Sequence, residues 1–160
     1  MKKIIPFIVL LLVLVACNKE KPKEPISFDK IDLTVTDQWG RIYGLQMDSL
    51  GSTKVSVGGK FAKAMEKEFL INQQILDSIS KVAKVVDIAK IDTGYNDTCK
   101  ICVGYKIEFA KSGKPVSTHV KNIQSNPKIA DLDKLVDLLY NVVRTVDKDP
   151  ESLVRKEEVK

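Results

Sequence analysis

Residues 28–36 read FDKIDLTVT, and this stretch decides the fold. Its apolar and polar side chains alternate, with Ile31, Leu33 and Val35 on one side and polar residues between them. Successive side chains of a strand point to opposite faces, so this period of two predicts a strand that is buried on one face only. Such a strand requires a second layer of structure against its apolar face.

The alternation continues along the chain. Residues 37–40 have the composition of a turn, and residues 41–48 and 53–57 predict two further strands. Three strands joined by short turns predict an antiparallel meander. Residues 60–69 fit either a loop or a further short extended piece.

Two helices and a hairpin are predicted next. Asn72 suits the N-cap of a helix that runs to about Val86, with apolar residues at three- and four-residue spacing. Residues 101–109 and 115–120 predict two strands that are joined by a Gly-containing turn. A last helix opens at Asn126-Pro127 and carries the most regular apolar stripe in the chain, up to Val146.

The predicted order is therefore β-β-β-α-β-β-α. We expect an α+β domain of two layers, with a mostly antiparallel sheet of about five strands and both helices on one face. The chain divides into a signal peptide (1–16), a lipidated cysteine with a flexible tether (17–26), a single α+β domain (27–147) and a charged tail (148–160).

The N-terminus has the pattern of a secretory signal. Two lysines precede about a dozen apolar residues at 4–15, a run too short to span a bilayer as a helix. The run closes on Leu14-Val15-Ala16-Cys17, which resembles the lipobox of bacterial lipoproteins. An uncleaved N-terminal anchor, or an ordinary signal with a chance cysteine, is the alternative interpretation.

The resemblance to lipoproteins implies that the signal is cut before Cys17. In that family the cysteine carries diacylglycerol and its new amine is usually acylated, so diacylglycerol and palmitate are the implied lipids and the bilayer is the implied partner. Asn18 stands where an aspartate would suggest retention in the inner membrane. We therefore expect the outer membrane, with the domain facing the periplasm or the cell surface.

Residues 27–146 also resemble a small domain-of-unknown-function family of bacterial lipoproteins. In that family a strand meander and a helix precede a tyrosine, a short linker with an aspartate, a hairpin and a final helix. Tyr95, Asp97 and the strand at 101–109 match these positions. The resemblance implies a fold and no activity.

Net charge argues against a nucleic-acid partner. The chain has 26 basic and 21 acidic residues, and loss of Lys2 and Lys3 with the signal lowers the net charge from +5 to +3. No run of Lys and Arg is interleaved with aromatic residues, as it is on nucleic-acid surfaces.

Cys99 and Cys102 remain once Cys17 is assigned to lipid. In an oxidising compartment, an even pair predicts a structural disulfide or two unpaired thiols. Two alternatives are a redox Cys-x-x-Cys site and half of a zinc site that would use His119, the only histidine. We expect no cofactor and no metal.

Three aromatic residues are candidates for partner binding. Trp39 is the only tryptophan and lies in a predicted turn, where it either caps the end of the sheet or anchors a partner, and Tyr43 and Tyr95 are expected near it. We expect a non-enzymatic binding or structural domain, with an envelope or surface protein as a possible partner. The alternative is a thiol-disulfide or zinc-dependent enzyme that uses Cys99, Cys102 and His119.

Overall fold

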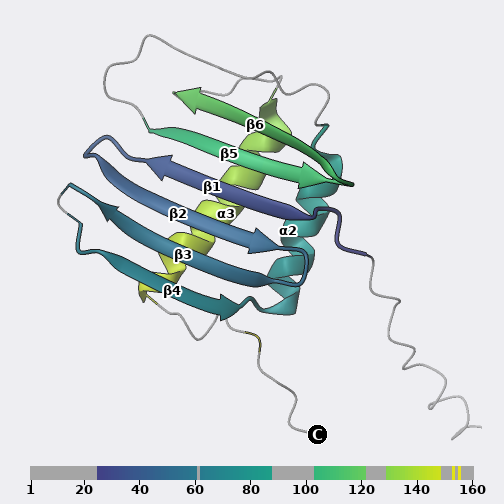
Figure 1. The fold of residues 1–160 in the computed structure, drawn as a ribbon, viewed down its shortest axis with the longest axis horizontal. Helices are drawn as coiled ribbons and strands as arrows, with labels where there is room; N and C mark the ends of the chain where they lie inside the picture. Colours follow the sequence, from purple (N-terminus) through teal and green to yellow (C-terminus); the bar gives the residue numbers. More distant parts are fainter. Residues whose placement is uncertain are drawn as a thin grey trace, which may run out of the picture.

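The computed structural model describes residues 25–60, 62–87, 103–121, 129–148, 153 and 155. Six strands and two helices lie within these residues (Figure 1). In chain order they are β1 (Lys30–Thr36), β2 (Arg41–Asp48), β3 (Ser52–Gly59), β4 (Met65–Leu70), α2 (Gln73–Val85), β5 (Gly104–Lys111), β6 (Lys114–Lys121) and α3 (Ala130–Lys148).

The strands form one sheet in the order β4-β3-β2-β1-β5-β6, and every neighbouring pair is antiparallel. The register aligns the apolar positions, because Leu33 pairs with Leu45 on one side and Ile107 on the other, and Leu45 pairs with Val55. One face of the sheet is therefore continuously apolar. The α+β fold and its antiparallel sheet are confirmed.

Both helices pack on the apolar face and leave the other face open. In Figure 1, α3 crosses behind the sheet from β6 to β4, and α2 lies behind one end of the strands. The core joins apolar residues of the strands to those of the helices. The predicted stripe of α3 is buried throughout: Leu132, Leu135, Val136, Leu139, Val142, Val143 and Val146.

The strand count differs from the prediction, because residues 65–70 form β4 at the edge of the sheet. Met65, Lys67 and Phe69 are its half-buried positions, so a lysine interrupts the apolar alternation. The structure accommodates it because Lys67 Nζ donates to the Val146 carbonyl oxygen of α3 at 3.3 Å. This partner lies 79 residues away in the sequence. Val103 falls within the strand predicted for residues 101–109, but in the structure it precedes β5 and is 39% exposed.

The start of α2 agrees with the prediction. The Asn72 side chain accepts a hydrogen bond from the Gln74 N–H at 2.8 Å, which satisfies one of the free donors of the first turn. On the buried side of α2, Ser80 holds the N-terminal segment, since the Ser27 N–H donates to Ser80 Oγ at 2.9 Å. Phe28 follows and is buried in the core. Ser27 and Phe28 therefore join the start of the described chain to α2 and the core.

Two described residues beyond α3, Leu153 and Arg155, contact the rest of the domain. Leu153 is buried, and its carbonyl oxygen accepts a hydrogen bond from the Asn72 N–H. The Arg155 N–H donates to the Leu70 carbonyl oxygen at 2.8 Å. These contacts join the tail to the end of β4 and the start of α2. Within the described ranges, no helix is both long and apolar enough to cross a membrane.

Candidate functional site

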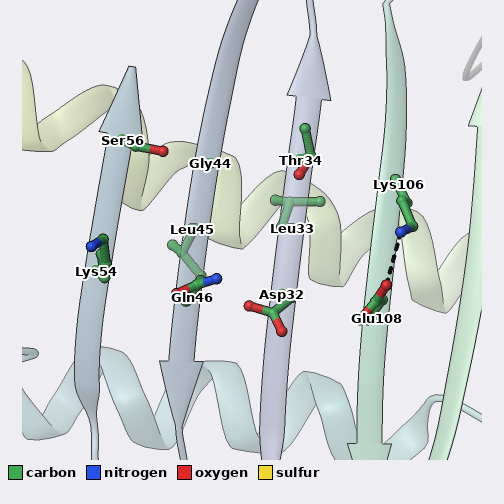
Figure 2. A pocket seen from close by; sticks show the side chains of 10 residues that line it. All are labelled: Asp32, Leu33, Thr34, Gly44, Leu45, Gln46, Lys54, Ser56, Lys106 and Glu108. Atoms are coloured by element: carbon green, nitrogen blue, oxygen red, sulfur yellow. Dashed lines mark ion pairs between the residues drawn. The ribbon is translucent and has the colours of Figure 1, made fainter. Parts of the chain in front are cut away.

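The open face of the sheet carries a hollow of about 450 Å³ (Figure 2). Gly44 lines it from β2, one of the two middle strands. A glycine inside a strand weakens it and commonly marks a close approach by another group. Here a Cβ on Gly44 would collide with the Ser56 hydroxyl, so the missing side chain makes room on this face. The lining residues are Asp32, Leu33, Thr34, Gly44, Leu45, Gln46, Lys54, Ser56, Lys106 and Glu108.

The charges around the hollow form ion pairs on neighbouring positions. Lys106 pairs with Glu108 at 2.8 Å, as Figure 2 shows, and Lys54 contacts Glu66 at 2.7 Å and Glu68 at 3.2 Å. The hydrogen bond from Lys106 lowers the pKa of Glu108 below its usual value. All these side chains are largely exposed, so the pairs contribute little to stability. They do set the pattern of charge that a bound partner would meet.

Asp32 is the one carboxylate of the hollow that is mostly covered. Its Oδ2 forms an ion pair with Lys30 Nζ at 2.6 Å. Its Oδ1 is buried and has no hydrogen-bond partner among the described residues. A buried acceptor without a donor costs about 1–3 kcal/mol. A ligand or an ordered water that donates an N–H or O–H to this oxygen recovers that energy.

A second pocket, of about 360 Å³, lies on the other side of the sheet near the C-terminal end of α3. We call it the basic pocket, because four of the described residues that line it are cationic and none of them is acidic. Its lining residues are Arg41, Tyr43, Val57, Ala62, Lys63, Met65, Val143, Arg144 and Lys148.

Two of the three predicted binding aromatics, Trp39 and Tyr43, lie within the described residues. Trp39 lies in the turn between β1 and β2 and is 61% exposed. Tyr43 is half-buried on β2, lines the basic pocket and packs edge-on against Tyr140, with ring centroids 5.4 Å apart. Tyr95 lies outside the described residues.

The candidate thiol and metal residues are only partly covered by the structure. His119 is exposed on the edge strand β6, paired in register with Lys106. Cys17, Cys99 and Cys102 lie outside the described residues. Among the residues that are described, no cluster of three or more His, Cys, Asp or Glu side chains is arranged to hold a metal ion.

Sequence reasoning did not identify the hollow or the basic pocket. The one local signal was Gly44, an isolated glycine within an otherwise regular strand pattern. Arg41, Lys63 and Arg144 come from separate segments, and no local pattern relates them. Comparison of the chain with protein-family models finds no match, and comparison with curated proteins finds none either.

Proposed function

We propose that this chain is an outer-membrane lipoprotein, anchored through acylated Cys17, whose domain is a non-enzymatic binding module. Residues 18–26 are charged and contain prolines, and the next residue, Ser27, is joined to α2 by the hydrogen bond to Ser80. At roughly 3.4 Å per residue, this tether reaches about 30 Å from the membrane surface. That length lets the open face of the sheet meet a partner in the envelope.

The observation that carries this proposal is the polar hollow over Gly44, where one Asp32 carboxylate oxygen finds no hydrogen-bond partner in the described part of the chain. An ordinary solvated sheet face presents side chains at every second residue. Here the face is hollowed at the centre of the sheet, where it is farthest from both edges. Its volume lies within the range of about 300–1,000 Å³ that is usual for binding sites.

The favoured occupant is a protein that places a lysine or arginine side chain in the hollow. Such a side chain donates to Asp32 Oδ1, and it meets ion pairs that together contain one more acid than base. The acids are Asp32, Glu66, Glu68 and Glu108, and the bases are Lys30, Lys54 and Lys106. Six strands about 4.8 Å apart and about 24 Å long offer roughly 550 Å². That area suits a partner that binds transiently, at the low end of interface size.

Site-specific photo-crosslinking in living cells tests the binding face. A photoreactive residue at Gln46, which is exposed on the open face, is compared with one at Ser78, which is exposed on α2. We expect a discrete crosslinked protein from position 46 only, and loss of most of it in Asp32→Asn. The matched control is Asp137→Asn, which removes an exposed carboxylate on α3. Equal crosslinking from both positions, or a yield that is indifferent to Asp32→Asn, would contradict the proposal.

The anchor has its own test. Metabolic labelling with an alkyne fatty acid is expected to mark the full chain, and Cys17→Ser is expected to abolish the label and release the protein from the membrane fraction. Cys99→Ser is the matched control and should keep both. A label that persists in Cys17→Ser would refute acylation at this cysteine.

A further inference from the structure

We propose that the basic pocket binds a small organic anion: a carboxylate or phosphate ester that is attached to an apolar or aromatic body. The pocket lies on the side of the sheet opposite to the open face, so this site is independent of the binding surface proposed above. The inference depends on how the pocket's cations are held and on what lies between them.

Arg41 is oriented by a neighbouring turn. Its Nε donates to Asp37 Oδ2 at 2.7 Å, while Asp37 Oδ1 accepts the backbone N–H groups of Trp39 and Arg41, each at 2.9 Å. The Asp37 side chain is only 10% exposed, so this arrangement is sheltered from solvent. The remaining N–H groups of the Arg41 guanidinium stay available to a ligand in the pocket.

Arg144, another cation of the pocket, is held by an aromatic pair. Its guanidinium carbon lies 5.9 Å from the centroid of the Tyr140 ring, within the range of a cation–π contact. Tyr140 in turn packs edge-on against Tyr43, a lining residue. Burial and the neighbouring Tyr43 raise the pKa of Tyr140, so its hydroxyl stays neutral and does not compete for the cation.

The positive charge of the pocket is largely uncompensated. Asp37 neutralises Arg41, but in the described part of the chain no ion pair joins Lys63, Arg144 or Lys148 to an acid. Like charges held close together repel, and a bound anion removes that repulsion. Guanidinium groups match carboxylate and phosphate in two parallel hydrogen bonds, so Arg41 and Arg144 favour these anions.

The pocket wall decides between a simple ion and an organic one. Val57, Met65 and Val143 line it beside the Tyr43 ring. An inorganic ion would leave this apolar surface in contact with water, whereas an apolar or aromatic body covers it. The volume of about 360 Å³ suits one such molecule and is too small for a folded partner.

The test uses the full chain in a phosphorus-free detergent and measures dissociation constants by ³¹P line broadening. The probe is phenyl phosphate, and inorganic phosphate and benzyl alcohol represent its two halves. We expect saturable one-to-one binding of phenyl phosphate that is about tenfold tighter than that of inorganic phosphate, because about 1.4 kcal/mol of apolar contact corresponds to tenfold. Benzyl alcohol, added in excess, should compete only weakly.

Two variants remove single cations from the pocket: Arg144→Gln and Lys63→Gln. Each is expected to weaken phenyl phosphate binding about five- to tenfold, since a charged hydrogen bond at a partly exposed site is worth about 1–1.4 kcal/mol. Arg144→Lys keeps the charge but loses the planar guanidinium group. Its affinity for phenyl phosphate should therefore lie between those of Arg144→Gln and the unmodified chain. Lys81→Gln, on the exposed side of α2, changes the net charge equally and should leave binding unchanged.

Arg144 and Lys81 are exposed on helices, and Lys63 is exposed in the β3–β4 connection. The melting temperatures of the variants should therefore lie within a few degrees of that of the unmodified chain. Equal dissociation constants for Arg144→Gln, Lys63→Gln and Lys81→Gln would overturn the proposal. Equal dissociation constants for inorganic phosphate and phenyl phosphate would also overturn it, because the apolar wall would then have no role.

Discussion

Leu153 offers a sharp test of how the chain is held together after its last helix. It belongs to the segment that the sequence predicts as a charged tail, yet it is only 4% exposed. Its carbonyl oxygen accepts a hydrogen bond from the Asn72 N–H. The substitution Leu153→Ala keeps that backbone bond available and removes only the buried side-chain atoms.

The expected loss follows from the buried volume. Leu→Ala removes three carbon groups, which at about 0.8 kcal/mol each amount to about 2.4 kcal/mol. A residual cavity of about 50 Å³ adds roughly 1.2 kcal/mol, at about 24 cal/mol per Å³. A tail can also detach instead of keeping a cavity, so its loss is limited by the free energy with which it docks. We therefore expect a loss of about 2–3.5 kcal/mol.

The same substitution at two other leucines brackets this value. Leu139 is fully buried in α3, which cannot detach without unfolding the domain, so Leu139→Ala should cost about 3–5 kcal/mol. Leu50 is 74% exposed in the β2–β3 turn, so Leu50→Ala should stay within about 0.5 kcal/mol of the unmodified chain.

Urea unfolding followed by circular dichroism measures all three variants. With a slope of about 1.5 kcal/mol per M, a loss of 3 kcal/mol lowers the midpoint by about 2 M. Hydrogen exchange gives a local readout, because the Asn72 amide should lose protection in Leu153→Ala first. A Leu153→Ala midpoint that matches that of Leu50→Ala would refute the reasoning, since the tail would then contribute nothing to the folded domain.

Three further predictions concern single interactions. Tyr105 is buried and its hydroxyl donates to Asp133 Oδ1 at 2.8 Å, so Tyr105→Phe should lower the free energy of unfolding by about 1.5–3 kcal/mol. Burial raises the pKa of Asp133. The difference between Tyr105→Phe and the unmodified chain in urea unfolding should therefore shrink once the pH falls below that pKa. Burial pushes the Asp37 pKa up, but its hydrogen bonds from Arg41 and Trp39 outweigh this and hold it below its usual value. The stability that Asp37 supplies is present above the pKa of an unfolded aspartate and is lost as the pH falls through the lower folded value. Urea midpoints from pH 5 to pH 2 should therefore fall more steeply for the unmodified chain than for Asp37→Asn, and parallel curves would contradict this. Gly51 has φ +88° and its Cβ would lie 3.1 Å from Leu76, so Gly51→Ala should lower the melting temperature by several degrees, whereas Gly58→Ala, with nothing within 4 Å, should leave it unchanged or raise it slightly.

The elements that the sequence predicts well are those whose pattern is local. Alternation at Ile31, Leu33 and Val35 predicts a strand with one buried face, and all three are buried. The Asn72 cap and the stripe of α3 are equally local signals, because each depends on residues within one or two helical turns. Placing both helices on one face follows from the fact that every strand has a single apolar side.

β4 shows where local reasoning fails. Lys67 occupies an inward position that a period-two pattern reserves for an apolar residue, and its partner is a carbonyl oxygen at the end of α3. The burial of Leu153 could not be predicted for the same reason, since its hydrogen-bond partner, Asn72, lies at the start of α2.

The sequence by itself determined a two-layer α+β domain, because hydrophobic periodicity reports which side of each strand and helix must leave water. It also predicts the lipid anchor, through a motif that lies outside the described residues. Only the tertiary structure decided where the hollow and the basic pocket lie. Strand register brings Asp32, Gly44 and Lys106 together on the open face, and helix packing brings Arg144 to the same pocket as Arg41. Such neighbours are far apart in the chain, and their proximity depends on pairing and packing that no local period encodes.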